Sequence, residues 1–171
     1  MEMRQQNSAV VLKTGASMVH SETNGNQYLT LRLGEEEYAI DILRVQEIRS
    51  YEEPTRMVNA PTFVKGVINL RGVIVPVVDL RLKLELRTVS YSEFTVVIIL
   101  NLHGTVIGAV VDAVSDVVTL NATSIKPAPQ FEAAIDSRFV TGLVNIGERM
   151  IIVMDVLALL SGAEIGMATR A

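Results

Sequence analysis

The side chains able to do chemistry are few and scattered along this chain. It contains no cysteine, and its two histidines are His20, in a polar N-terminal stretch, and His103, beside a glycine in a predicted turn. Neither lies in an HxxH, HExxH or Cys/His pattern that would bind a metal. A glycine-rich phosphate loop and a GxSxG nucleophile motif are also missing from the sequence. The sequence therefore predicts no catalytic residue, no metal site and no cofactor.

Acidic residues cluster at Glu35-Glu36-Glu37. They follow Gly34, between two stretches that alternate apolar and polar residues. We interpret them as the solvated tip of a hairpin rather than as an acid/base pair. An enzymatic or small-molecule-binding β-barrel is the alternative from a different class. It would need convergent histidines, cysteines or acids, which the sequence does not offer.

Composition narrows the class of protein further. The formal net charge of −4 argues against nucleic acid as a partner, because phosphate binding needs a basic face. No apolar run approaches the roughly 18 residues of a spanning helix, and no signal-peptide core precedes the first strand. We therefore expect a cytoplasmic protein without membrane insertion. Valine and isoleucine are abundant and tryptophan is absent, which favours an aliphatic β-core.

The elements that position the side chains are duplicated. Residues 63–80, FVKGVINLRGVIVPVVDL, recur without a gap as residues 139–156, FVTGLVNIGERMIIVMDV. Each copy predicts a hairpin, a long strand, a breaker-rich loop, a second hairpin and a short helical turn. We therefore expect an all-β protein built from two copies of a small five-stranded barrel. Six aligned pairs are identical: Phe63/Phe139, Val64/Val140, Gly66/Gly142, Asn69/Asn145, Val77/Val153 and Asp79/Asp155.

The domain boundaries follow from the same patterns. Residues 1–26 are polar and lack a steady period, which predicts a flexible tail. The ordered domain is expected over 27–162, with a first lobe at about 27–88 and a second lobe at about 89–162. A short polar tail follows at 163–171.

Four residues are assigned to backbone geometry. Asp79 and Asp155 each precede a short apolar-periodic run, as the N-cap of a helical turn does. Gly66 is expected to allow a bulge or a positive φ where a strand begins. Gly72 is expected to supply a positive φ in a tight turn between two strands.

Two strands are expected near sheet edges. The stretch 43–50 mixes charged and apolar residues on both faces, which suits an edge or the side of a groove. Pro76 lacks an N–H group, so the strand 73–78 is expected at an edge or beside a bulge.

Some charges of the first copy have no counterpart at the matching position of the second. Lys65 aligns with Thr141, and Arg71 aligns with Gly147. Two lobes that share a scaffold but differ at their tips favour an adaptor with two different faces. The alternative for Arg71 is an ordinary exposed turn residue.

Several segments resemble the CheW family of bacterial chemotaxis coupling proteins. The resemblance covers Tyr28 to about Leu160, and its segments are YAIDILRVQEIRSYEEPTRMVNAPTFVKGVINLRGVIVPVVDLR, TVVIILNL, VVDAVSDVVTL and KPAPQF. It implies two pseudo-symmetric five-stranded SH3-like barrels that share a hydrophobic core, and an adaptor without catalytic activity or cofactor. It also implies two partners in membrane-associated arrays. These are the cytoplasmic tip of a chemoreceptor (methyl-accepting chemotaxis protein) and the regulatory domain of the chemotaxis histidine kinase.

The resemblance further implies where the partners bind. The receptor tip is expected at a groove by the first barrel, on Val45, Glu47, Lys65 and Arg71. The kinase is expected on the second barrel, and the residues assigned to it are Val114, Val117 and Gly142. Partial burial in the core is the alternative for Val45, solvation on a strand for Glu47, and a core or backbone role for the three kinase residues.

A coupling module of a larger kinase or coupling–receiver protein is the alternative within the binding class. The sequence ends at Ala171 without a receiver-like or ATPase segment, which favours a free-standing adaptor.

Overall fold

The computed structural model describes residues 25–86, 89–127 and 137–161. Within these ranges ten strands form two five-stranded sheets. Sheet A has the strand order β8-β1-β2-β10-β9, and sheet B has the order β3-β6-β7-β5-β4. The strands are β1 (Asn26–Leu33), β2 (Glu36–Asp41), β3 (Val45–Ser50), β4 (Val64–Leu70), β5 (Val73–Asp79), β6 (Val96–Leu102), β7 (Thr105–Val111), β8 (Ala113–Leu120), β9 (Val140–Ile146) and β10 (Arg149–Met154).

Short helical segments connect or follow these strands. They are η3 (Ile42–Arg44), α1 (Leu80–Lys83), η4 (Ala122–Ser124), η5 (Ser137–Phe139) and α2 (Val156–Leu159). The predicted N-terminal tail lies outside the described residues except for Gly25 and Asn26, and the predicted C-terminal tail lies wholly outside them.

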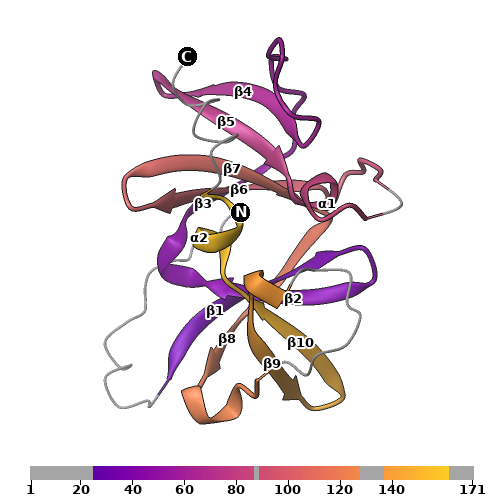
Figure 1. Cartoon of the computed structure of the whole chain (residues 1–171), viewed down its shortest axis with the longest axis vertical. Coiled ribbons are helices and arrows are strands. Elements are labelled where there is room, and N and C mark those ends of the chain that lie inside the picture. The colour runs from indigo at the N-terminus through magenta and orange to yellow at the C-terminus, as the bar shows by residue number, and fades with distance from the viewer. Residues whose placement is uncertain (1–24, 87–88, 128–136, 162–171) are drawn as a thin grey trace, which may run out of the picture.

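The two copies of the repeat exchange their first hairpins. β1 and β2 belong to the first copy, yet they pair with β8 and β10 of the second copy. In the same way β6 and β7 of the second copy pair with β3 and β5 of the first. Sheet B is therefore one continuous stretch of chain, whereas sheet A joins the N-terminal hairpin to the last three strands. A division of the chain between residues 88 and 89 therefore does not separate sheet A from sheet B. The two sheets stack one above the other in Figure 1.

Three apolar clusters fill the fold. The largest takes buried side chains from both sheets, such as Leu31 of β1 and Ile98 of β6. A smaller cluster lies within each sheet, around Ile99 in sheet B and around Ile151 in sheet A. The all-β class, the two five-stranded SH3-like sheets and the shared core confirm the predicted architecture. Neither sheet closes into a complete barrel through strand pairing of the described residues.

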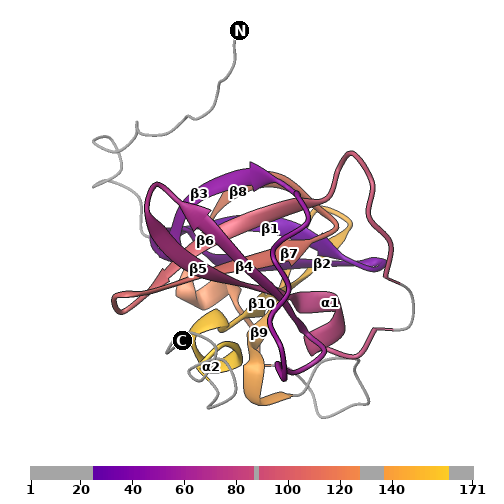
Figure 2. The same cartoon turned by 90° about the horizontal axis from the view of Figure 1, so that it is seen from above.

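The helical turns α1 and α2 begin after Asp79 and Asp155, as the repeat predicts. The Asp79 carboxylate accepts a hydrogen bond from the backbone N–H of Arg81 at 3.0 Å, and Asp155 accepts one from Ala158 at 3.2 Å. Seen from above, both helices lie on one side of the molecule, while β3 and β8 lie on the other (Figure 2).

Gly66 lies where a second segment of chain crosses β4. Its φ is +146°, and the pairing of β4 with β5 shifts register between Val64 and Gly66. Thr55 exchanges two backbone hydrogen bonds, of 2.9 and 2.8 Å, with Val67, the residue that follows Gly66. A Cβ atom on Gly66 would lie 2.0 Å from the carbonyl oxygen of Thr55, so a side chain cannot be accommodated there.

Pro76 lies in an interior strand, so of the two positions expected for its strand the sheet edge is wrong, whereas the bulge agrees with the register shift in the pairing of β5 with β4. β5 runs between β4 and β7. Pro76 is opposite Val67, a pair that exchanges no ladder hydrogen bonds, because Val67 directs its N–H and C=O groups to Thr55. The parallel ladder with β7 begins only at Val77. The missing N–H group of the proline therefore breaks no hydrogen bond of the sheet.

Candidate functional site

Side chains of β3 meet the β4–β5 hairpin at the surface of sheet B, although β3 and β4 are opposite edges of this sheet. Glu47 of β3 forms an ion pair with Arg71, which follows β4. Arg49 lies 3.5 Å from the same carboxylate. The side chain of Arg71 is 64% exposed and that of Glu47 is 28% exposed, so a partner can reach the pair. Sheet B is therefore curled until its edges approach each other.

The turn that carries Arg71 is built by its neighbours. Arg71 and Gly72 have φ values of 52° and 90°, the pattern of a type I′ hairpin turn. The side-chain oxygen of Asn69 accepts a hydrogen bond from the N–H of Gly72 at 2.7 Å. The β6–β7 turn, Asn101-Leu102-His103-Gly104, repeats this arrangement with a bond of 2.8 Å. His103 is thus an exposed turn residue, and Arg71 projects from a fixed hairpin tip.

The structure places the other two predicted receptor residues further along the same edges. Val45 is half-buried at the start of β3 and packs against the central cluster. Lys65 lies near the start of β4, whereas Arg71 follows its end. The Lys65 ammonium is 5.3 Å from the centre of the Tyr91 ring. Glu47 and Arg71 therefore meet directly, while Lys65 lies near the opposite end of β4.

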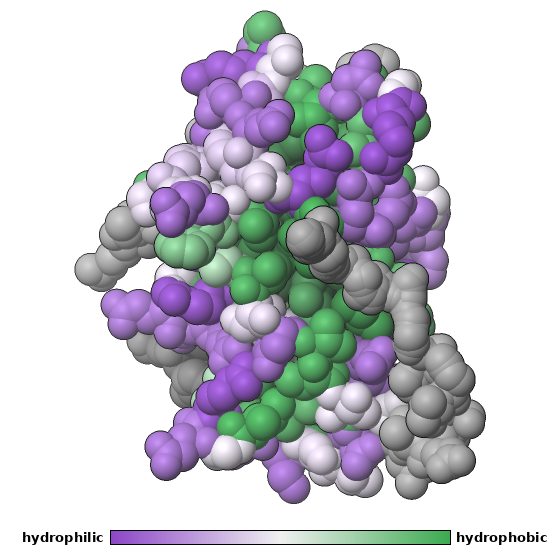
Figure 3. Space-filling view, turned by 180° about the vertical axis from the view of Figure 1, so that it is seen from behind, coloured by the Kyte–Doolittle hydropathy of each residue, from purple (hydrophilic) through white to green (hydrophobic). Residues whose placement is uncertain are grey.

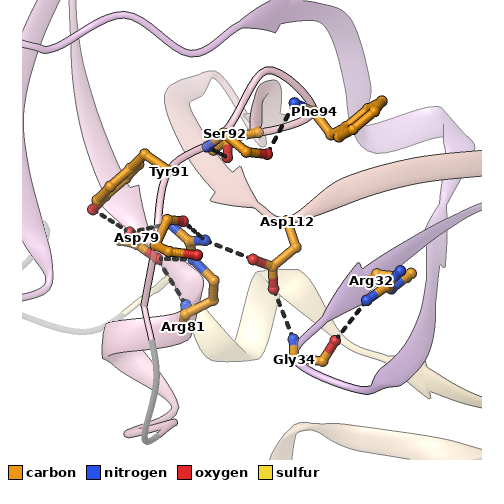
Figure 4. Close-up of polar contacts among 10 residues, drawn as sticks. Arg32, Gly34, Asp79, Arg81, Tyr91, Ser92, Phe94 and Asp112 are labelled. Carbon is orange, nitrogen blue, oxygen red and sulfur yellow. Dashed lines mark hydrogen bonds and ion pairs between the residues drawn. The ribbon is translucent and has the colours of Figure 1, made fainter.

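A buried ion-pair network lies beside Tyr91 (Figure 4), the ring that Lys65 approaches. The fully buried side chain of Arg81, on α1, donates to both carboxylate oxygens of Asp79 at 2.9 Å each. It also donates to Asp112 at 2.7 Å and to the carbonyl of Ser90 at 2.6 Å. The hydroxyl of Tyr91 donates to Asp79 at 2.7 Å. Sequence reasoning missed this network, because Arg81 looks like any arginine of a short amphipathic turn.

The network links the two sheets. Asp112 lies between β7 and β8, and its second oxygen accepts a hydrogen bond from the N–H of Gly34, in the β1–β2 turn, at 2.7 Å. Burial opposes the charged form of Arg81, but hydrogen bonds and charges from Asp79 and Asp112 outweigh it and raise the pKa of Arg81. The guanidinium therefore stays charged, and its two carboxylates compensate the cost of burying it.

Sheet A carries a counterpart of the Glu47 ion pair. The residues VQEI at 45–48 of β3 align with VSDV at 114–117 of β8, so Asp116 corresponds to Glu47. Asp116 lies 3.3 Å from Arg149 of β10. Arg149 also pairs with Glu37. The hydrogen bond from Thr30 lowers the pKa of Asp116, and Arg149 lowers it further. Sheet A therefore also has an arginine–acid pair, so the charge difference between the two copies is smaller than the aligned positions indicated. The arginine of this pair, Arg149, belongs to strand β10, whereas Arg71 lies in the hairpin turn.

The residues assigned to the kinase lie in three different environments. Val117 of β8 is 50% exposed and offers apolar surface. Val114, on the same strand, is half-buried and packs against the central cluster. Gly142 of β9 is buried, and a Cβ atom there would lie 2.4 Å from the carbonyl oxygen of Lys126. Packing within the chain therefore accounts for Gly142.

An apolar band runs along the face opposite to that of Figure 1, with polar side chains on either side (Figure 3). This is the side on which β3 and β8 lie. Both strands carry an exposed apolar side chain, Ile48 at 42% and Val117 at 50%. Exposed apolar surface rimmed by charges is typical of protein–protein contact sites.

The described part of the chain has neither a metal-binding cluster nor a membrane-spanning helix. Its His, Cys, Asp and Glu side chains form no group of three or more able to hold a metal ion. A polar hollow lined by Glu35, Glu37, Asp116 and Arg149 is open to solvent. Across 25–86, 89–127 and 137–161, no helix has the length and apolar character to cross a membrane.

Comparison with known proteins identifies similar chains over most of this length. The family model of the CheW-like domain matches residues 27–164. The chemotaxis protein CheW of Klebsiella aerogenes is 52% identical over 151 residues, which are 88% of this chain and 91% of that protein. The chemotaxis protein CheW of Bacillus subtilis is 35% identical over 119 residues, 70% of each. The crystal structure of the scaffolding protein TtCheW from Thermoanaerobacter tengcongensis aligns with a TM-score of 0.75 and 32% identity, covering 82% of this chain and 95% of that chain.

Proposed function

The chain belongs to the CheW-like domain family, and we propose that it is a non-catalytic chemotaxis adaptor. It couples the cytoplasmic tips of chemoreceptors to the regulatory domain of the chemotaxis histidine kinase. It works in the cytoplasm, recruited to membrane-associated receptor arrays, and uses no cofactor. The family membership supports this function, and so do the different surfaces that the two sheets present.

The receptor tip binds at the edge of sheet B, on Val45, Glu47, Lys65 and Arg71. The observation that carries this assignment is the Glu47–Arg71 ion pair on a fixed hairpin tip. Exposed ion pairs contribute only about 0–1 kcal/mol to stability, so the fold has little need of this pair. The two residues that follow the turn, Val73 and Ile74, are 54% and 60% exposed and supply apolar surface beside the charges.

Arg71 can hold Glu47 and a receptor carboxylate at the same time, because a guanidinium has five N–H donors in a planar fork. Glu47 fixes the orientation of that fork before the receptor arrives. A helical receptor tip would lay its apolar face on the aliphatic surface, with the ion pair setting its register at the rim.

The kinase regulatory domain binds sheet A, around the exposed Val117. Val114 packs the same strand against the central cluster, and Gly142 acts only through the packing of β9 against the segment at Lys126. Separate partner surfaces on separate sheets allow one chain to hold both partners at once.

Exchanging the charge of Arg71 tests the receptor site. We expect Arg71→Glu to weaken binding of a receptor cytoplasmic fragment by at least about tenfold, because it places a second acid beside Glu47 and repels the receptor carboxylate. The melting temperature should change little, since the pair is exposed. Isothermal titration with the purified fragment gives the dissociation constant, and circular dichroism gives the melting temperature.

Two variants complete this experiment. Arg32→Glu makes the same charge change on an exposed residue of sheet A and should leave receptor binding unchanged. The double variant Glu47→Arg/Arg71→Glu restores an internal ion pair but should still bind weakly, because the charge facing the receptor stays inverted. Unchanged receptor binding by Arg71→Glu would remove the basis for this site.

A further inference from the structure

Two tyrosines and a lysine form a stack at the end of β4 opposite to Arg71. The rings of Tyr51 and Tyr91 are parallel within 26°, and their centres are 4.6 Å apart. The Lys65 ammonium lies 5.3 Å from the centre of the Tyr91 ring, and the Arg81 guanidinium lies 4.8 Å from it. Tyr91 is nevertheless 40% exposed. An aromatic surface with a cation beside it is therefore open to a partner.

Buried charges hold this stack in place. The Tyr91 hydroxyl donates to Asp79, which is itself bound by both arms of the fully buried Arg81. Arg81 also holds the chain next to the ring through the carbonyl of Ser90. A buried ion pair is seldom the most stabilising filling of a core, since well-packed apolar residues often serve as well or better. This cluster does what apolar packing could not, which is to fix a tyrosine at the surface through its hydroxyl group.

The stack continues the proposed receptor surface. Tyr51 is four residues beyond Glu47, and alternate residues of a strand share one face. Its N–H donates to the carbonyl of Thr95, which extends the pairing of β3 beyond Ser50. On the opposite edge, Lys65 and Arg71 lie at the two ends of β4. The Glu47–Arg71 pair and the tyrosine stack are therefore the two ends of one surface between β3 and β4.

We propose that Tyr91 is a receptor-contacting residue and that Asp79 and Arg81 are its positioning residues. This inference rests on the proposed function. The occupant is the helical receptor tip, carrying a carboxylate toward Lys65 and an apolar side chain on the exposed part of the tyrosine stack. Lys65 retains donors for such a carboxylate, because its ammonium group faces a ring rather than an acid. Tyrosine gives a large contact area at a small entropic cost, more so when its ring is already fixed.

Substitutions at Tyr91 test this assignment. We expect Tyr91→Ala to weaken binding of the receptor cytoplasmic fragment by at least about tenfold, as loss of an interface aromatic does. Tyr91→Phe keeps the ring but loses the hydrogen bond to Asp79, so its affinity should lie between those of Tyr91→Ala and the unsubstituted protein. Phe94→Ala is the matched control, since it removes a 66% exposed aromatic of the same loop that is not part of the stack. Binding of the kinase regulatory domain is measured in parallel, and a purely structural role would weaken both partners alike.

The outcomes separate this inference from the proposed function. If Arg71→Glu weakens receptor binding and Tyr91→Ala does not, the tyrosine assignment fails while the adaptor function stands. If the unsubstituted protein does not bind the receptor fragment, the proposed function itself fails. Equal losses in Tyr91→Ala and Phe94→Ala, or equal losses for receptor and kinase, would also overturn the assignment. If Tyr91→Ala does not fold, Lys65→Met removes the cation of the stack at the surface, and unchanged receptor affinity then counts against the proposal.

Discussion

At the scale of single residues, the two capping aspartates have matched positions but different environments. Asp155 is exposed, and its carboxylate accepts the capping hydrogen bond of α2. Asp79 caps α1 in the same way, but it is fully buried and also binds Arg81 and Tyr91. One sequence motif therefore has two energetic roles, and the difference comes from what surrounds each carboxylate.

Replacing each aspartate by alanine should reveal this difference. We expect Asp155→Ala to lower the free energy of unfolding by about 1 kcal/mol, the usual value of a lost cap. Asp79→Ala should lower it by about 3–5 kcal/mol, because it leaves the buried Arg81 with Asp112 as its remaining carboxylate. Equilibrium urea unfolding followed by circular dichroism measures both values. Equal losses would mean that the buried network adds nothing beyond the cap.

At the scale of elements, the β4–β5 hairpin depends on two glycines for different reasons. Gly72 needs its positive φ in the turn, but an added Cβ atom would meet no other atom within 4 Å. Gly66 combines a positive φ with a backbone carbonyl 2.0 Å from where its Cβ would lie. The turn could therefore relax around a substitution, whereas the crossing of Thr55 over β4 could not.

Alanine at each glycine tests this reasoning. Gly72→Ala should lower stability by about 1 kcal/mol through the cost of its backbone conformation. Gly66→Ala should lower it by roughly 3 kcal/mol or more, because a backbone carbonyl must move as well. Melting temperatures of the two variants, measured side by side, give the comparison. A similar, small shift for both would contradict the close approach at Gly66.

At the scale of the whole molecule, the exchanged hairpins make the two sheets dependent on each other. Each sheet takes two central strands from the other copy of the repeat. The largest apolar cluster is shared between the sheets, and Arg81 and Asp112 connect α1 to the β1–β2 turn. Neither sheet keeps a complete core when the other is lost.

Hydrogen exchange should therefore report one cooperative unit. We expect the amides of Leu31 in sheet A and Ala109 in sheet B to exchange only through global unfolding. Their free energies of opening should agree with each other and fall with the same slope as urea is added. Two separate values, or two slopes, would show that one sheet opens without the other.

The sequence by itself determined the features that depend on near neighbours in the chain. Alternation of apolar residues predicted the hairpins, the repeat predicted two equivalent units, and the aspartates before short apolar runs predicted the helical turns. These features follow from periodicity, turn geometry and capping, which act over a few residues. Glu47 and Arg71, which the structure joins in one ion pair, were assigned instead through the resemblance to the CheW family.

Only the tertiary structure decided which strands pair and which charges are buried. The exchange of hairpins is not visible in a repeat, because either copy offers an equivalent edge to the same strand. Glycine is needed at 142 because a Cβ atom there would meet the carbonyl oxygen of Lys126. The buried charge of Arg81 is compensated in part by Asp112, a residue 31 positions away. Such contacts depend on how distant segments meet in the folded chain, and no local pattern records that meeting.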